Sequence, residues 1–136
     1  MSIEETIMNQ YNVDNILHYF QKIANVPRKS GHEQAISNYI KDWAINLGLD
    51  VFQDEQYNLI IKKVGTAGYE SHEPVILQGH MDMVWEKNKN TDFDFETQGI
   101  ELVVKDGFLR ANGTTLGGDD GIAVAYMLEL MDRNDI

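Results

Sequence analysis

The sequence predicts an α/β fold in which helices pack on a mixed β-sheet. Two stretches with helical periodicity open the chain, short strand-like segments fill its middle, and an apolar helix closes it. At 136 residues the chain has about the size of one domain, and no linker or repeat divides residues 1–136. We therefore expect a single unit without an internal boundary.

The opening half of the chain carries the start and stop signals of two helices. Residues 12–24 repeat apolar side chains every three or four positions, and Pro27 closes that segment. Ser30 and Glu33 have the spacing of a capping box, in which each side chain bonds the other's backbone. They predict the start of a second amphipathic helix, which continues to residue 47 and ends at Gly48.

Strand patterns follow. Residues 49–53 and 58–64 predict one hairpin, and residues 100–104 and 108–111 predict another around the tight-turn pair Asp106 and Gly107. The short apolar run at residues 74–78 predicts a strand buried on both faces. The last helix runs to about residue 130 and is apolar nearly all round, so it needs cover on several sides. Because such a helix would normally lead into another strand, we expect a chain that is cut short.

Composition excludes several classes of protein. The net charge is −11, with 11 basic against 22 acidic residues, which argues against a nucleic-acid partner. There is no cysteine, so disulfides and thiolate metal sites are excluded. No apolar run is long enough for a membrane helix, and the acidic N-terminus lacks the features of a signal peptide. We expect a cytoplasmic protein that does not bind membranes.

The first candidate for chemistry is the pair His80 and Asp82, at the exit of the predicted strand 74–78. Ligands bind at the carboxyl ends of strands in open α/β sheets. Residues two apart in extended backbone point the same way, so Asp82 could hold the imidazole of His80 while the other ring nitrogen binds a metal. The alternative is a surface histidine beside a solvated aspartate.

The second candidate is the segment 114–121, where Gly117 and Gly118 precede Asp119 and Asp120 at the start of the last helix. Aspartates at a helix start commonly cap it, and this interpretation suits Asp120 better than Asp119. A phosphate-binding glycine loop is a further alternative. It fails because two adjacent carboxylates would repel an anion and no P-loop lysine follows.

Together the two motifs resemble those of the aminoacyl-histidine dipeptidases, of the two-zinc peptidase superfamily that includes acetylornithine deacetylase and carboxypeptidase G2. The residues that carry the resemblance are Leu77-Gln78-Gly79-His80-Met81-Asp82-Met83-Val84 and Gly113-Thr114-Thr115-Leu116-Gly117-Gly118-Asp119-Asp120-Gly121-Ile122, with support from residues 23–30. The resemblance implies that residues 1–136 are the N-terminal portion of a metallopeptidase catalytic domain.

The resemblance also implies roles for three residues. His80 would be a ligand of one zinc ion, Asp119 would bridge two zinc ions, and Asp82 would be the catalytic residue that orients His80. It further implies a cis peptide bond between Asp119 and Asp120. Manganese or cobalt could replace zinc at such a ligand set. His18 and His32, expected in helices, and His72, expected in a loop, are interpreted as structural or surface residues.

The implied reaction is hydrolysis of Xaa-His and other dipeptides by a water that bridges the two metals. The general-base glutamate and the remaining ligands of the family lie beyond residue 136, so we expect no turnover by this chain alone. The intact enzyme would be a homodimer, and this chain could self-associate through an exposed sheet edge. Two alternatives stay open: a non-catalytic binding or scaffold module on the same fold, and a related amidohydrolase such as a deacetylase or tripeptidase.

Overall fold

The computed structural model describes residues 13–136. In chain order it contains α2 (Val13–Ala24), α3 (Gln34–Asn46), β1 (Asp50–Gln53), β2 (Leu59–Lys62), β3 (Leu102–Lys105), β4 (Phe108–Ala111) and α4 (Gly118–Asp132). The predicted α/β class is confirmed. The predicted start of the first helix at Asn12 and the acidic N-terminus lie outside the described residues.

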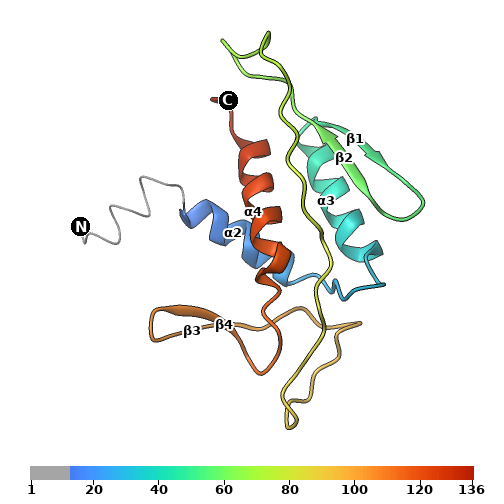
Figure 1. Ribbon diagram of the computed structural model, residues 1–136, viewed down its shortest axis with the longest axis vertical. Helices are drawn as coiled ribbons and strands as arrows, with labels where there is room; N and C mark the ends of the chain where they lie inside the picture. The colour runs from blue at the N-terminus through green and yellow to red at the C-terminus, as the bar shows by residue number, and fades with distance from the viewer. Residues whose placement is uncertain (1–12) are drawn as a thin grey trace.

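The core lies between the three helices. α4 packs against α2, which crosses it at an angle, and α3 stands on the other side of α4 in Figure 1. The periodic apolar positions of each helix meet there and are almost completely buried: Ile16, Phe20, Ile23, Ile36, Ile40, Val124, Ala125 and Leu128. The apolar character of α4 predicts that other elements cover it on several sides. This cover is incomplete, because Ile122 and Tyr126 remain exposed.

The four strands form two separate antiparallel hairpins instead of one mixed sheet. β1 and β2 lie against α3, whereas β3 and β4 lie at the opposite end of the molecule (Figure 1). The second hairpin turns at Asp106 and Gly107, whose φ angles are 54° and 77°. Two consecutive left-handed residues define the tight turn that this pair predicts. Both predicted hairpins are confirmed.

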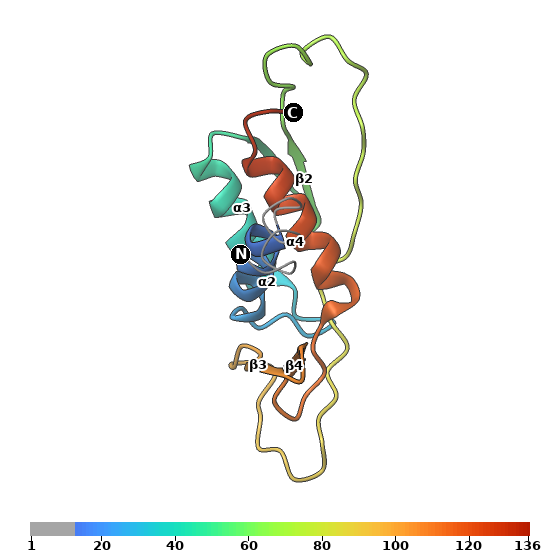
Figure 2. The same ribbon diagram turned by 90° about the vertical axis from the view of Figure 1, so that its left-hand side faces the viewer.

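The prediction for residues 74–78 is wrong. In the described part of the chain this run pairs with no strand, and Val75 and Ile76 are 83% and 89% exposed. It runs beside α4 and β2 in Figure 1 and stands away from both in the perpendicular view of Figure 2. A pocket of about 1040 Å³ lies between this run, β2 and α4. Apolar composition predicted burial, but burial also needs neighbouring strands, which residues 13–136 do not supply here.

The prediction of a capping box at Ser30 and Glu33 is also wrong, because both side chains have other partners in the folded chain. The residue before α3 is Glu33, its side chain makes no capping hydrogen bond to the helix, and its carboxylate accepts a bond from the backbone of Gly31 (2.5 Å). The Ser30 hydroxyl is directed to Asp82, 52 residues away in the chain. His32 accordingly lies in the loop before α3 and not in a helix. None of the described helices is long and apolar enough to cross a membrane.

Candidate functional site

Two segments far apart in the chain bring His80 and Asp119 into contact. His80 follows the extended run 74–78, and Asp119 follows the glycine pair at the start of α4. The distance from His80 Nε2 to Asp119 Oδ1 is 3.0 Å. Both side chains are accessible, since His80 is 52% exposed and Asp119 is 95% exposed. The spatial convergence on which the sequence interpretation depends is therefore present.

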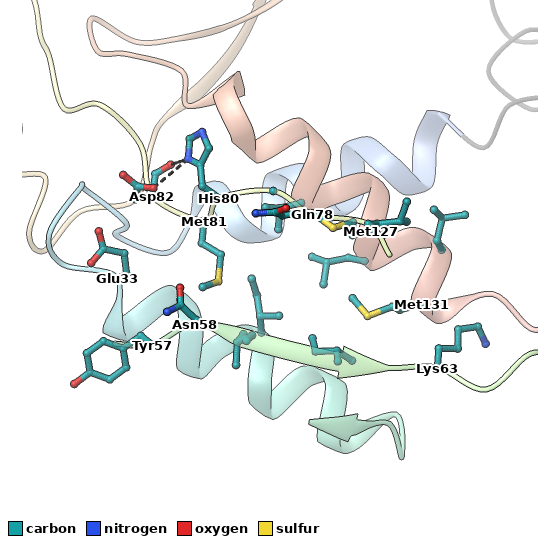
Figure 3. A pocket seen from close by; sticks show the side chains of 18 of the residues that line it. Glu33, Tyr57, Asn58, Lys63, Gln78, His80, Met81, Asp82, Met127 and Met131 are labelled. Atoms are coloured by element: carbon teal, nitrogen blue, oxygen red, sulfur yellow. Dashed lines mark hydrogen bonds and ion pairs between the residues drawn. The ribbon is translucent and has the colours of Figure 1, made fainter. Parts of the chain in front are cut away.

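The other ring nitrogen of His80 faces Asp82. His80 Nδ1 lies 3.0 Å from Asp82 Oδ1 and 3.1 Å from the Asp82 carbonyl oxygen (Figure 3). Ser30 Oγ donates a hydrogen bond of 2.5 Å to the second carboxylate oxygen of Asp82. The ring is thus held between two carboxylates, and one of these carboxylates is itself fixed by a hydroxyl.

These contacts favour the charged forms of His80 and Asp82. The hydrogen bond from Ser30 is the main cause that lowers the pKa of Asp82, and the neighbouring His80 lowers it further. Partial burial disfavours a charged imidazole, but the hydrogen bonds to Asp119 and Asp82 outweigh it and raise the pKa of His80 above its ordinary value. These two carboxylates orient the ring and make it more basic than a free imidazole.

The backbone at the start of α4 is irregular, and the carboxylates of its two aspartates contact different atoms of His80. Gly117 has φ 75°, and both Asp119 and Asp120 have non-helical angles. The peptide bond between Asp119 and Asp120 is cis, as the resemblance implies. The carboxylate of Asp120 accepts a hydrogen bond from the backbone N–H of His80 (3.3 Å). The interpretation of Asp120 as a helix cap is therefore wrong, because its carboxylate supports the histidine.

Glycine at position 79 is required by close approach of α4. A Cβ atom at Gly79 would lie 2.7 Å from Asp120 Oδ2 and 2.9 Å from the Met127 methyl carbon. Because no side chain fits there, the backbone of His80 can approach the carboxylate of Asp120. The glycine in the motif thus has a specific packing role beside the candidate site.

Arg28 is the site residue that sequence reasoning missed. Its side chain is only 2% exposed and donates hydrogen bonds to the backbone carbonyls of Met81 (3.1 Å) and Gly117 (2.8 Å). Burial lowers the pKa of Arg28 to about 10, against the opposing effect of the Asp82 charge. In the sequence Arg28 is simply a basic residue in a loop, and only the tertiary structure shows that it lies between the two motifs.

The donor set fits a divalent transition metal. An imidazole nitrogen and a carboxylate oxygen are within hydrogen-bond distance of each other, at an accessible position, and both are donors that zinc accepts. Within residues 13–136, no group of three or more His, Cys, Asp or Glu side chains is placed to hold a metal ion. The other three histidines have partners elsewhere in the described chain: His18 packs against Tyr19, His32 lies 3.8 Å from Glu96, and His72 packs against Tyr69. The residues that are present therefore fit part of a metal site.

Comparison with solved structures shows which proteins contain this fold. The chain matches a solved aminoacylhistidine dipeptidase from Vibrio alginolyticus with a TM-score of 0.86 and 40% identity, over 90% of this chain and 25% of the other. It matches a solved tripeptidase from Staphylococcus aureus subsp. aureus Mu50 with a TM-score of 0.62 and 26% identity, over 87% of this chain and 31% of the other. The α/β fold of this chain is therefore one that solved peptidases contain.

Comparison of sequences also finds a similar dipeptidase. The chain is 38% identical over 128 residues to the cytosol non-specific dipeptidase of Escherichia coli strain K12. This match covers 93% of this chain and 26% of the relative. No family model matches the chain. The similarity to aminoacyl-histidine dipeptidases that the two motifs predict is confirmed. The chain spans about a quarter of the length of these two relatives.

Proposed function

We propose that this chain forms part of a metal-dependent dipeptidase that hydrolyses Xaa-His and other dipeptides. The observation that carries the proposal is the contact between His80 Nε2 and Asp119 Oδ1, in a chain similar to named dipeptidases. The chain spans about a quarter of the length of those relatives. The hydrolytic activity is therefore proposed for a dipeptidase that contains this segment, and not for residues 1–136 alone.

In this proposal His80 and Asp119 hold zinc, with manganese or cobalt as alternatives. When bound, the metal would acidify a water molecule and polarise the peptide carbonyl. Asp82 acts through His80: it accepts the Nδ1 proton of the ring, which leaves Nε2 as the donor toward the metal. Asp120 fixes the same residue from the other side through the His80 backbone N–H.

A chimera tests the proposal directly. The part of this chain that matches the E. coli dipeptidase replaces the corresponding segment of that enzyme, and hydrolysis of Xaa-His dipeptides is measured with added zinc. We expect the chimera to be active, and His80→Ala or Asp119→Ala to reduce its kcat/KM by at least roughly a thousandfold, as loss of a ligand removes the metal's contribution. An active chimera that tolerates both substitutions would overturn the assignment.

A tripeptidase is the second candidate, because the tripeptidase from S. aureus shares the fold. The lower TM-score and identity of that match favour the dipeptidase. A panel of dipeptides and tripeptides of equal composition, hydrolysed by the same chimera, separates the two activities. We also propose a cytoplasmic location, in line with the name of the E. coli relative.

A further inference from the structure

Arg28 occupies the junction of the two segments that carry the candidate site. Its backbone pairs with the segment after His80: Met83 N–H donates to the Arg28 carbonyl (2.9 Å), and Ser30 N–H donates to the Met83 carbonyl (3.0 Å). This is the parallel bridge between Lys29 and Met83. The loop after α2 therefore holds the His80 segment through its backbone.

The side chain of Arg28 extends the same contact to the Asp119 segment. Nη1 donates to the carbonyl of Met81, the residue between His80 and Asp82. Nη2 donates to the carbonyl of Gly117, two residues before Asp119. One planar guanidinium thus joins both segments through two different nitrogens, a geometry that a lysine ammonium cannot reproduce.

The surroundings of the guanidinium are shaped to receive it. A Cβ atom at Gly121 would lie 2.6 Å from Nη2 of Arg28, and a Cβ atom at Gly117 would contact the same nitrogen even more closely. The charge is buried against carbonyl oxygens, and Nε has no partner among the described residues. Burying this cation is costly compared with an apolar side chain of similar volume, since burial lowers the pKa of Arg28 even against the opposing charge of Asp82. A purely packing role would therefore be better filled by methionine or leucine.

We propose that Arg28 is a positioning residue that fixes His80 against Asp119 and thereby sets the affinity of the site for a divalent metal. The inference rests on the proposed function for its metal, and on the contacts of Arg28 alone for its geometry. The side-chain hydrogen bonds of Arg28 reach the backbone carbonyls of Met81 and Gly117, so Arg28 acts on the His80 ring and the Asp119 carboxylate through the backbone.

The test compares Arg28→Met and Arg28→Lys with Lys29→Met in the full chain. Lys29 is a matched control because its ammonium pairs with Glu96 (2.6 Å) and lies over the ring of Trp85, and neither residue belongs to the candidate site. Zinc affinity is measured by competition with a chromophoric chelator. In the metal-free chain, long-range 1H–15N spectra report the His80 ring nitrogens, and circular dichroism reports the fold.

Both Arg28 variants are expected to stay folded, to bind zinc roughly 10–100-fold more weakly, and to shift the His80 Nε2 resonance in the absence of metal. Lys29→Met is expected to match the unmodified chain in all three measurements. Folded Arg28 variants with unchanged zinc affinity and an unchanged His80 spectrum would overturn the proposal. Loss of the fold in both variants would also overturn it, because Arg28 would then serve the whole fold and not the site.

A second comparison separates this proposal from the proposed function. Zinc affinity is also measured for His80→Ala. If it equals that of the unmodified chain, the proposal that His80 binds the metal fails. The metal-free His80 spectrum of the Arg28 variants still decides whether Arg28 positions the ring.

Discussion

Substitution of Gly79 by alanine tests whether close packing of α4 supports the candidate site. The new Cβ atom would lie 2.7 Å from Asp120 Oδ2 and 2.9 Å from the Met127 methyl carbon. The methionine end can rotate away at little cost, whereas Asp120 can move only by losing its bond to the His80 N–H. Overpacking of this kind costs about 1–3 kcal/mol, and we expect a loss of about 2 kcal/mol in the free energy of unfolding.

Urea unfolding followed by circular dichroism measures this loss. With a slope of about 2 kcal/mol per molar urea, the midpoint should fall by about 1 M. Gly118→Ala is the matched control, since the nearest heavy atom to a Cβ there is 4.0 Å away and its φ is not left-handed. We expect its free energy of unfolding to change by less than about 0.5 kcal/mol.

A double-mutant cycle identifies the clash. If the cost comes from Asp120, then Asp120→Ala should shrink the effect of the Gly79 substitution by at least about 0.5 kcal/mol. Equal urea midpoints for Gly79→Ala and Gly118→Ala would refute a clash at position 79. An unchanged cost of Gly79→Ala in the Asp120→Ala background would refute Asp120 as its cause.

Three further predictions concern the surroundings of the site. Ser30→Ala removes the 2.5 Å bond to Asp82 and should weaken zinc binding roughly 10-fold in a chelator competition; an unchanged affinity would contradict the support role of Ser30. The hydrogen bond from Lys29 is the main cause that lowers the pKa of Glu96, so the stabilisation from this pair is present above the ordinary glutamate pKa and lost as the pH falls through the lowered value. Lys29→Met should raise the pKa of Glu96 measured by NMR titration, and equal values in the two proteins would contradict the pairing. The exposed run at residues 74–78 should cause concentration-dependent self-association, which Ile76→Lys reduces; sedimentation of the unmodified chain as a monomer at all concentrations would exclude this.

The sequence predicted the elements whose signals are local. The periodicity of residues 12–24 describes one face of α2 because neighbours three and four apart share that face. Asp106 and Gly107 predicted a hairpin because the turn needs two left-handed residues, a condition that those two residues meet without help from elsewhere.

The errors involve partners that are distant in the chain. Ser30 has the spacing of a helix cap, but Asp82 competes for its hydroxyl in the folded state. Asp120 has the position of a cap, but its carboxylate accepts a hydrogen bond from the backbone N–H of His80. The run at residues 74–78 has the composition of a buried strand, and composition does not show whether a pairing strand is available.

The candidate site was predictable to the extent that its residues stand in recognisable motifs. His80, Asp82 and Asp119 were named from the sequence, and the structure brings them together. Their roles toward a metal stay predictions. The role of Arg28 could not be predicted, because no local sequence pattern indicates that an arginine is buried between two backbone carbonyls.

A zinc titration followed at the four histidines tests the central claim most directly. Long-range 1H–15N spectra resolve the ring nitrogens of His18, His32, His72 and His80 separately. We expect zinc to shift Nε2 of His80 first, and Asp119→Ala to abolish this response while Nδ1 remains bonded to Asp82. A titration in which another histidine responds and His80 does not, or in which the His80 response survives loss of the Asp119 carboxylate, would contradict a shared metal site.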